Sequence, residues 1–467
     1  MNNDPMLVPT VAFWILASLT FFLPIRWSLV FYLLLVQIDL SAVGNFSTDS
    51  LGIQNAIKVI IIPTILLIKL RKEIHFDKSA RKYFVPWILF SSYACIALFW
   101  SPYRISALKM NGYLYAYTIL FVVFVTTWQQ EWLNKYKLMF VVWVTLAAGI
   151  IQTYFLGNAF GSDEFQSRFT TFTGAQSLAP FLLCMMVLLL FRERASFFTF
   201  LTATGAAIGV LLTGSRSVFL GMVWVLLIYG IYSAVRSAKT VRIGMILGRM
   251  MILGAAMAVI ILVVVEWLPN NRLNEMLTAA VEKNATVDDV GTFGWRFSLY
   301  QRTLDELIHR SLPRLLVGSG TSSGADLVLD GGFFNEDNVD PNRAIHDEFL
   351  RTTYEWGLLG LAPFVLFLVR ILKLDLRQVS KNASPQAWAF LAIVVPFFIS
   401  LSVENFLADS GSPGGVGYNL VLTSMMALVV SRSEENESSP AQQTPGAIPA
   451  TSQSIWIMPE NREADEI

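Results

Sequence analysis

The sequence predicts an all-α protein that crosses a membrane many times, and three observations support this fold class. Of the 467 residues, 54% are hydrophobic and only 15% are charged, whereas a soluble globular chain carries roughly 25% charged residues. The apolar residues fall in blocks about 15–25 residues long, the length that crosses roughly 30 Å of hydrocarbon. The net charge is zero, so no nucleic-acid partner is expected.

Thirteen apolar blocks are candidate membrane spans, and we expect about 12–13 transmembrane helices. Cys95 and Cys184 both lie inside such blocks, so buried thiols are expected rather than a disulfide. The first block lacks the basic region and cleavage site of a signal peptide and is kept as a span. The candidate spans are 8–24, 27–42, 51–70, 86–100, 107–127, 137–157, 177–191, 197–213, 216–235, 247–268, 345–371, 387–408 and 415–431.

Lysine and arginine set the expected orientation, because they collect in the cytoplasmic connections of membrane proteins. The basic connections lie at 69–82, 135–137, 192–194, 236–249 and 370–381. The alternate connections are poor in basic residues and contain Asp49, Asp163, Glu164, Glu404 and Asp409. We therefore expect the basic set and the C-terminus in the cytoplasm, with the N-terminus and segment 269–344 on the outer side.

The expected organisation is a transmembrane domain over 1–431, a large outer helical loop at 269–344 inserted within it, and a disordered cytoplasmic tail at 432–467. The tail is rich in Ser, Pro, Glu and Gln. The loop begins with a helical pattern, RLNEMLTAAVEKN, and a second helix is expected from Trp295. The apolar residues at helical spacing in that second helix are Phe297, Tyr300, Leu304, Leu307 and Ile308. Loops of this length are often functional.

The stretch LLTGSRSVFLG (211–221) forms a tight turn between two candidate spans on the expected outer side. Thr213 or Ser215 can cap the helix that follows. A helix N-terminus presents free N–H groups and a partial positive charge that suit a phosphate, and Arg216 adds a planar fork that grips two oxygens. The alternative is an arginine that snorkels to lipid headgroups. Arg216 and Ser215 are therefore candidate residues of an anion site.

Arg296 opens the second predicted loop helix, with Trp295 before it and Tyr300 one turn later. Taken alone, this residue fits a solvated arginine on an amphipathic helix that rests on the membrane. Its position on the same expected side as Arg216 makes it a second candidate for an anion site.

The stretch AIHDEFLRTTYEWGLLGLAPF (344–364) carries one of only three histidines. Asp340 and Pro341 predict a helix start, and the helix is expected to run to about Ile371 with His346 near its outer end. One face, expected to point into the protein through glycine contacts, holds His346, Leu350, Thr353, Gly357, Gly360 and Phe364. The opposite side is expected to hold Glu348, Arg351 and Glu355, paired at one-turn spacing.

Taken together, Arg216, Arg296 and His346 favour a reaction centre over the alternative that each merely lies at the membrane boundary of a helix. Two arginines can bind a diphosphate, and a neutral histidine near its ordinary pKa can take a proton from a sugar hydroxyl. The acidic stretch EDNVD (336–340) fits no metal template well. A solvated acidic loop is therefore favoured there, and no metal is expected.

These stretches resemble the O-antigen ligase family of bacterial membrane glycosyltransferases, which also includes Wzy-type polysaccharide polymerases. The motifs are LTGSRSVFLG, WRFSLYQRTLDELIHRSLPRLLVGSGTSSG and AIHDEFLRTTYEWGLLGL, of which the last is the most specific. Weaker matches are LFWSPYRISAL (98–108) and RFTTFTGAQSLAPF (168–181).

The resemblance implies transfer of a glycan from undecaprenyl diphosphate to an acceptor hydroxyl at the periplasmic face of the bacterial inner membrane. The lipid diphosphate leaves, and no metal, cofactor or nucleotide sugar is needed. The implied fold is a helical membrane type (GT-C-like), shared with the peptidoglycan polymerases of the shape, elongation, division and sporulation family.

Carried over by residue, Arg216, Arg296 and His346 match the family's functional arginines and histidine, and Arg168 matches a further basic position in a shorter outer loop. The family often has Asn after the histidine, where this chain has Asp347. That departure leaves open whether His346 acts as a base or as a phosphate ligand. It makes Asp347 and the neighbouring Glu348 candidate modulators.

Three functions remain open at the level of sequence. The first is a ligase that transfers a glycan to a lipid A core or another acceptor, and the second is a Wzy-type polymerase of repeat units. The third is a transporter of a polysaccharide or an amphiphile, with the arginines along an anion path. A transporter more often shows repeated halves and a midplane site, whereas the cations here map to one expected surface.

Overall fold

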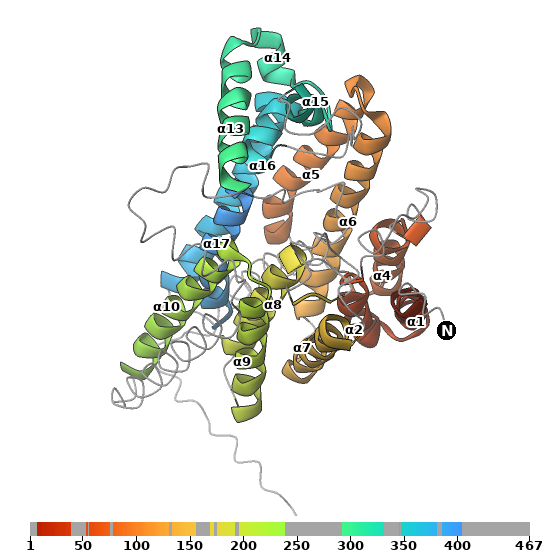
Figure 1. The fold of residues 1–467 in the computed structure, drawn as a ribbon, viewed down its shortest axis with the longest axis vertical. Coiled ribbons are helices and arrows are strands. Elements are labelled where there is room, and N and C mark those ends of the chain that lie inside the picture. Colours follow the sequence, from red (N-terminus) through yellow and green to blue (C-terminus); the bar gives the residue numbers. More distant parts are fainter. Residues whose placement is uncertain are drawn as a thin grey trace, which may run out of the picture.

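The computed structural model describes residues 7–38, 53–54, 56–74, 78–129, 133–155, 169–171, 175–191, 196–238, 292–330, 345, 347–380 and 385–403. Every regular element within these ranges is a helix (Figure 1). The predicted all-α fold class is therefore confirmed for the described residues.

The helices follow the apolar blocks of the sequence closely. In chain order they are α1 (Leu7–Phe22), α2 (Ile25–Leu35), η2 (Ile57–Ile61), α4 (Ile62–Leu70), α5 (Lys78–Ile96), η3 (Ala97–Trp100), α6 (Arg104–Gln129), α7 (Lys135–Ile150), η4 (Ile151–Phe155), α8 (Ala175–Leu190), α9 (Phe197–Leu212), α10 (Arg216–Ala238), α13 (Thr292–His309), α14 (Leu312–Val317), α15 (Gly324–Asp330), α16 (Glu348–Ser380) and α17 (Pro385–Val403).

The membrane character of the chain is visible in the lengths and composition of these helices. Among the described residues, five helices are long and apolar enough to cross a bilayer: Lys82–Trp100, Arg104–Thr127, Lys135–Phe155, Val218–Arg236 and Glu348–Val379. Shorter apolar helices are Leu7–Phe22, Ile25–Leu35, Leu178–Leu190, Phe197–Leu212 and Ala387–Phe398. The chain is thus a polytopic membrane protein, as predicted. Two expected spans, 247–268 and 415–431, lie outside the described residues.

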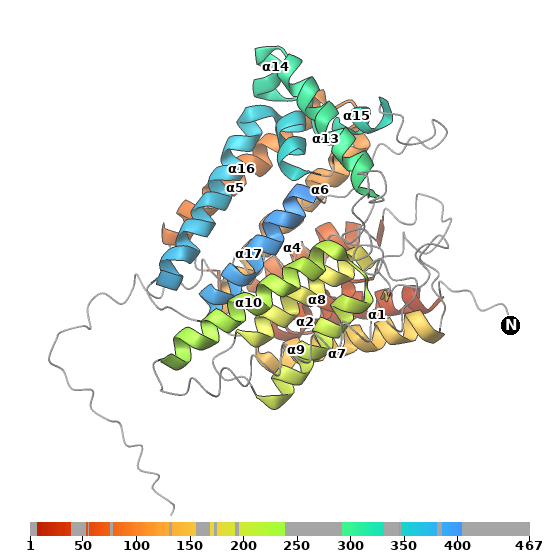
Figure 2. The same ribbon diagram turned by 60° about the vertical axis from the view of Figure 1, so that its left-hand side comes forward.

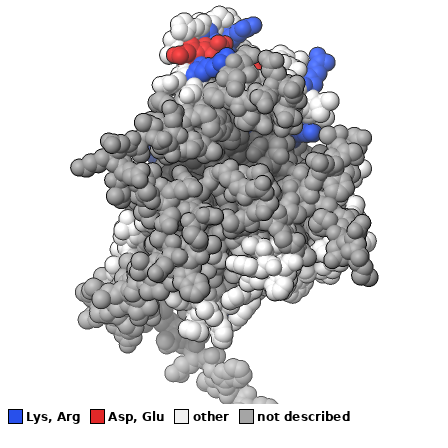
Figure 3. Space-filling view, viewed as in Figure 1, with Lys and Arg blue, Asp and Glu red and all other residues white. Residues whose placement is uncertain are grey.

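The helices form a bundle with one distinct end. Long helices α5 and α16 pack side by side, α8 packs on α9, and α10 packs on α17 (Figures 1 and 2). Helices α13, α14 and α15 lie together at the end of the molecule where α16 begins. On the face drawn in Figure 3, the charged side chains that are visible gather at this same end. We call α13–α15 with the start of α16 the polar module.

Side-chain caps hold several helix ends. Asn134 Oδ1 accepts the Lys137 N–H at 3.1 Å at the start of α7, and N-caps of this type stabilise a helix by about 1 kcal/mol. Lys69 Nζ donates to Thr20 O at 3.0 Å, Leu23 O at 2.7 Å and Ser28 Oγ at 2.8 Å. Its ammonium therefore satisfies carbonyls at the end of α1 and ties α4 to the α1–α2 turn. Both cysteines, Cys95 and Cys184, are free, but only Cys184 is buried; the expectation of a buried thiol is wrong for Cys95, which is exposed.

Helix α16 breaks at Gly357, where the backbone adopts φ 61° and ψ −169°. Gly318, just after α14, has φ 82°, and the two glycines meet: a Cβ on Gly357 would lie 2.3 Å from Leu316 O. A Cβ on Gly318 would lie 2.4 Å from Glu355 O. Only glycine tolerates both the positive φ and this backbone contact.

The expectation of one uninterrupted helix from about 341 to 371 is therefore wrong. The described helix begins at Glu348 and is interrupted after Trp356. The shared face predicted for Gly357, Gly360 and Phe364 with the residues before the break is lost, because face counting assumes a continuous helix. The sequence pattern predicts that Gly357 allows close contact with another helix, whereas in the structure Gly357 permits the break in α16.

Replacing Gly357 by Ala should destabilise the protein by at least about 2 kcal/mol, because positive φ alone costs roughly 1–2 kcal/mol and the added methyl meets a carbonyl. Gly112→Ala on α6 is the matched control, since a Cβ there meets only Ile60 Cδ1 at 3.8 Å and Val59 Cγ1 at 4.0 Å. Thermal unfolding in detergent should show a lower midpoint for the first variant alone. Equal midpoints would contradict the described backbone geometry at Gly357.

Candidate functional site

The turn before α10 has the tight form that its sequence predicts. Helix α9 ends at Leu212 and α10 begins at Arg216. Thr213 is fully buried; its Oγ1 donates to Val210 O at 2.6 Å and accepts the Ser215 N–H at 3.4 Å. Ser215 O accepts the Phe219 N–H at 3.0 Å, so Ser215 stands at the position that caps α10. Arg216 is the first residue of α10, and its side chain lies outside the described atoms.

A second segment is tied to this turn. The Phe169 N–H donates to Leu212 O at 3.1 Å, and the Phe169 ring packs on Gly149, where a Cβ would lie 2.3 Å from ring atom Cζ. Arg168 itself lies outside the described residues. The structure nevertheless holds the residue that follows Arg168 against the end of α9, four residues before Arg216.

Helix α13 contains Arg296 in its second turn, as the predicted loop helix requires. The Arg296 side chain is not among the described atoms. Two of the apolar residues at helical spacing lie at the surface: Leu304 is 46% exposed and Ile308 is 73% exposed. The buried face holds Leu299, Thr303 and Leu307.

The buried face of α13 packs into a small apolar cluster apart from the main core. Its buried members are Leu299, Leu307, Leu327, Val328, Ile345 and Tyr354. This satellite cluster joins α13 and α15 to residue 345 and to the start of α16. His346 lies outside the described residues, but its neighbour Ile345 is fully buried here. The structure therefore brings the helix of Arg296 and the residue before His346 into one cluster.

The first turn of α13 faces the start of α10. In Figures 1 and 2, the end of α13 remote from α14 lies next to the upper end of α10, where α10 follows α9. The backbone thus places the N-terminal ends of α10 and α13, the helices that contain Arg216 and Arg296, on the same side of the molecule.

Asp347 caps helix α16. Its Oδ1 accepts the Leu350 N–H at 2.8 Å, and its backbone carbonyl accepts the Arg351 N–H at 2.9 Å. Burial raises the pKa of the Asp347 carboxyl above its usual value, although hydrogen bonds from the backbone of Leu350 and Phe349 oppose this shift. Asp347 is therefore the N-cap of α16.

The side of α16 that was expected to face away from the protein interior is buried. Glu348, Arg351 and Glu355 are exposed by 0%, 1% and 0%. Arg351 Nε lies 3.3 Å from Glu355 Oε1, so the predicted pairing at one-turn spacing is present, but inside the protein. The polar segment 318–324 and the start of α6 cover this side. Charged residues are buried only when they are paired, and hydropathy alone did not indicate that partners were near.

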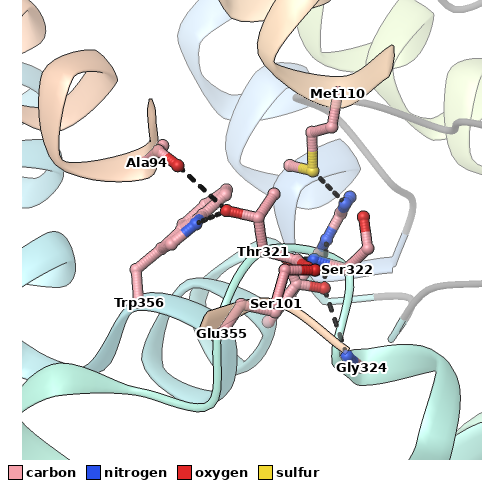
Figure 4. Close-up of polar contacts among 9 residues, drawn as sticks. Ala94, Ser101, Met110, Thr321, Ser322, Gly324, Glu355 and Trp356 are labelled. Carbon is pink, nitrogen blue, oxygen red and sulfur yellow. Dashed lines mark hydrogen bonds and ion pairs between the residues drawn. The ribbon is translucent and has the colours of Figure 1, made fainter. Parts of the chain in front are cut away.

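A chain of hydrogen bonds joins this buried face to the ends of α5 and α6 (Figure 4). Thr321 Oγ1 donates to Ala94 O and accepts Trp356 Nε1–H, each at 3.0 Å. Ser101 Oγ donates to Thr321 O at 2.6 Å, and Arg351 Nη2 donates to the Met110 sulfur at 2.7 Å. Three sequence motifs, LFWSPYRISAL, LLVGSGTSSG and TTYEWG, therefore meet at one place.

Arg310 is a contact residue that the sequence analysis missed. Its guanidinium lies 3.6 Å from the centroid of the Tyr354 ring, and Nη1 donates to Tyr354 O at 2.9 Å. Glu306 lies one turn earlier, 3.6 Å from Arg310 Nε. The only sequence signal for these contacts is the one-turn spacing of the acid and the base. Arg310 therefore fastens the end of α13 to α16 beside the break at Gly357.

These features define the class of protein: an all-α polytopic membrane protein with a polar helical module over one end of the bundle. The model of the O-antigen ligase family matches residues 198–365. The matched stretch runs from α9 to the middle of α16 and includes Arg216, Arg296 and His346, so the resemblance indicated by the motifs is confirmed there. The match supports an O-antigen ligase or polymerase and does not distinguish a ligase from a polymerase. No curated protein is similar enough to count as a relative.

The capping role of Asp347 predicts that two substitutions differ in their effect on the free energy of unfolding. Asp347→Ala removes the cap and should lower the free energy of unfolding by about 1 kcal/mol. Asp347→Asn keeps an acceptor oxygen for the Leu350 N–H and should keep that stabilisation. Unfolding midpoints in detergent measure both effects.

The raised pKa of Asp347 predicts a pH dependence as well. A raised folded-state pKa means that the folded protein binds the proton more tightly, so its stabilising contribution is complete below the usual aspartate pKa. That contribution is lost as pH rises through the folded-state pKa. The Asn variant should therefore gain stability relative to the native protein as pH rises above the usual aspartate pKa. A gap that stays constant with pH would contradict the burial of the charge.

Proposed function

We propose that the protein transfers a glycan from undecaprenyl diphosphate to an acceptor hydroxyl at the periplasmic face of the bacterial inner membrane. The observation that carries this proposal is the match of residues 198–365 to the O-antigen ligase family, because that stretch contains both candidate arginines and the candidate histidine. The bilayer holds the lipid donor, and the C-terminus is cytoplasmic in the orientation that the basic connections favour.

In this proposal the diphosphate binds at the start of α10. The N–H groups of the first helical turn and the Arg216 guanidinium provide positive charge, with Ser215 at the cap position. Arg296 closes on the diphosphate from α13, and Arg168 adds charge from the segment tied to Leu212. These charges stabilise the leaving group as the bond between the sugar and the phosphate breaks.

His346 acts as the base in the reaction. The acceptor hydroxyl gives its proton to the imidazole, the hydroxyl oxygen forms a bond to the anomeric carbon, and undecaprenyl diphosphate leaves with the bonding electron pair. A direct displacement of this kind inverts the anomeric configuration. Asp347 holds the start of α16 beside His346, and Glu348 adds a buried carboxyl on the first turn.

Two other functions compete with this one. A Wzy-type polymerase uses the same donor chemistry but takes a second lipid-linked repeat unit as its acceptor. A transporter for a polysaccharide or an amphiphile would move the lipid-linked glycan without breaking it. The match to the O-antigen ligase family favours glycan transfer over transport and leaves ligase and polymerase as alternatives.

Arg216→Ala, Arg296→Ala and His346→Ala should each lower the transfer rate by at least about 100-fold, the usual range for loss of a base or of a charge that stabilises a leaving group. Purified protein in lipid bilayers would be given a lipid-diphosphate oligosaccharide and a lipid A core acceptor. Arg314→Ala on α14 and His309→Ala at the end of α13 are matched controls, because both residues are exposed and should keep full activity. Full activity of a well-folded His346→Ala variant would refute its role as base.

The same assay separates the competing functions. Release of undecaprenyl diphosphate with transfer to the lipid A core supports the ligase, and release with elongation of the lipid-linked glycan supports the polymerase. Movement of the donor across the bilayer without release supports the transporter and contradicts the proposal. A base also predicts that the rate falls as pH drops below the imidazole pKa, which a phosphate ligand does not require.

A further inference from the structure

Glu355 holds one segment of the polar module with both its side chain and its backbone. Its Oε2 accepts the Ser322 N–H at 2.9 Å, and its Oε1 accepts the Gly324 N–H at 3.3 Å. Its backbone carbonyl accepts the Gly320 N–H at 2.8 Å. The carboxylate is fully buried and also pairs with Arg351. One acidic residue thus fixes the turn at 320–324 against the first part of α16.

The other side of this turn meets the residue before His346. A methyl group at Gly324 would lie 3.1 Å from Glu355 Oε1 and 3.3 Å from Ile345 Cδ1. Gly324 therefore fills the narrow space between the carboxylate and the Ile345 side chain. Ile345 in turn belongs to the satellite cluster with Leu299, which lies three residues after Arg296 on α13. The contacts run without interruption from Glu355 through Gly324 to Ile345 and α13.

We propose that Glu355 is a positioning residue, which sets Ile345 and α13, and thereby the segments of His346 and Arg296, through the turn at 320–324. The kinetic part of this inference rests on the glycan transfer proposed above, whereas the structural part does not. Asp347, the residue after His346, is held by capping α16. The backbone is therefore held on both sides of the histidine.

The contacts of Glu355 require a carboxylate. The Ser322 N–H, the Gly324 N–H and the Arg351 guanidinium are all donors, and a carboxylate offers two acceptor oxygens to them. Glutamine has the same shape but one acceptor oxygen, and its NH₂ group would face a donor. Aspartate is one methylene shorter and would not span the same gap. Charge-assisted hydrogen bonds of this kind are also stronger than neutral ones.

A positioning role predicts a particular kinetic pattern. A reacting group displaced by about 1 Å costs on the order of 100-fold in rate, because alignment in the transition state is lost. Donor binding depends mainly on the diphosphate contacts, which Glu355 does not make. Loss of Glu355 should therefore lower kcat and leave the KM for the donor nearly unchanged.

The experiment compares Glu355→Gln with Glu306→Gln in the full-length protein in lipid bilayers. Glu306 is the matched control, because it also pairs with an arginine one turn away but its side chain is 48% exposed. Hydrogen exchange is measured for peptides that cover 292–309, 318–326 and 345–350, with 104–129 as the reference. Glu355→Gln should speed exchange about 10-fold in the first three peptides only, and lower kcat by roughly 10- to 100-fold. Glu306→Gln should change neither quantity.

Gly324→Ala provides a second route to the same test if Glu355→Gln folds poorly. It keeps the carboxylate and adds a methyl group between Glu355 and Ile345, so faster exchange at 345–350 is again expected. Unchanged exchange at 345–350 in a folded variant overturns the proposal, as does equal acceleration in the 104–129 reference. If the exchange pattern appears but the native protein transfers no glycan, the positioning contacts stand and the proposed function fails.

Discussion

The break at Gly357 is the constraint on which the polar module depends. A break in a membrane helix leaves carbonyl groups without intrahelical partners, and such groups must be satisfied within the protein. Here Tyr354 O accepts the Ser319 N–H at 3.0 Å and Arg310 Nη1 at 2.9 Å, and Glu355 O accepts the Gly320 N–H. The segment after α14 therefore replaces the missing helical bonds. This replacement works only because Gly318 and Gly357 let the two backbones touch.

The candidate site is built from two parts of the chain that are held by different means. The start of α10 is fixed by backbone bonds in a tight turn, to which the segment of Phe169 is added. The residues around 345 and the helix of Arg296 are fixed by the satellite cluster and the buried polar face of α16. A diphosphate that bound between α10 and α13 would contact both parts.

Much of this fold could be read from the sequence, because hydropathy blocks and helix caps are local signals. The apolar blocks gave eleven helical regions of the described chain, and the turn at Thr213 and the helix of Arg296 were also predicted. The break at Gly357 could not be predicted, because a glycine permits a positive φ without indicating one. The burial of Arg351 and Glu355 followed from that break and from partners far away in sequence. His346 and Arg168 lie outside the described residues. His346 is within the stretch matched to the O-antigen ligase family, whereas Arg168 lies before it, so the predicted role of Arg168 rests on its sequence motif and on its neighbour Phe169.

The contacts between the module and the bundle also set the order in which the protein can be completed. Ser101 bonds to Thr321 across 220 residues of sequence. At a synthesis rate of about 5–20 residues per second, α5 and α6 would wait roughly 10–45 s for this partner. During that interval Ser101, the carbonyl of Ala94 and the start of α6 lack the groups that later cover them. A nascent chain interrupted before α14 would therefore present an incomplete polar end on an otherwise apolar bundle.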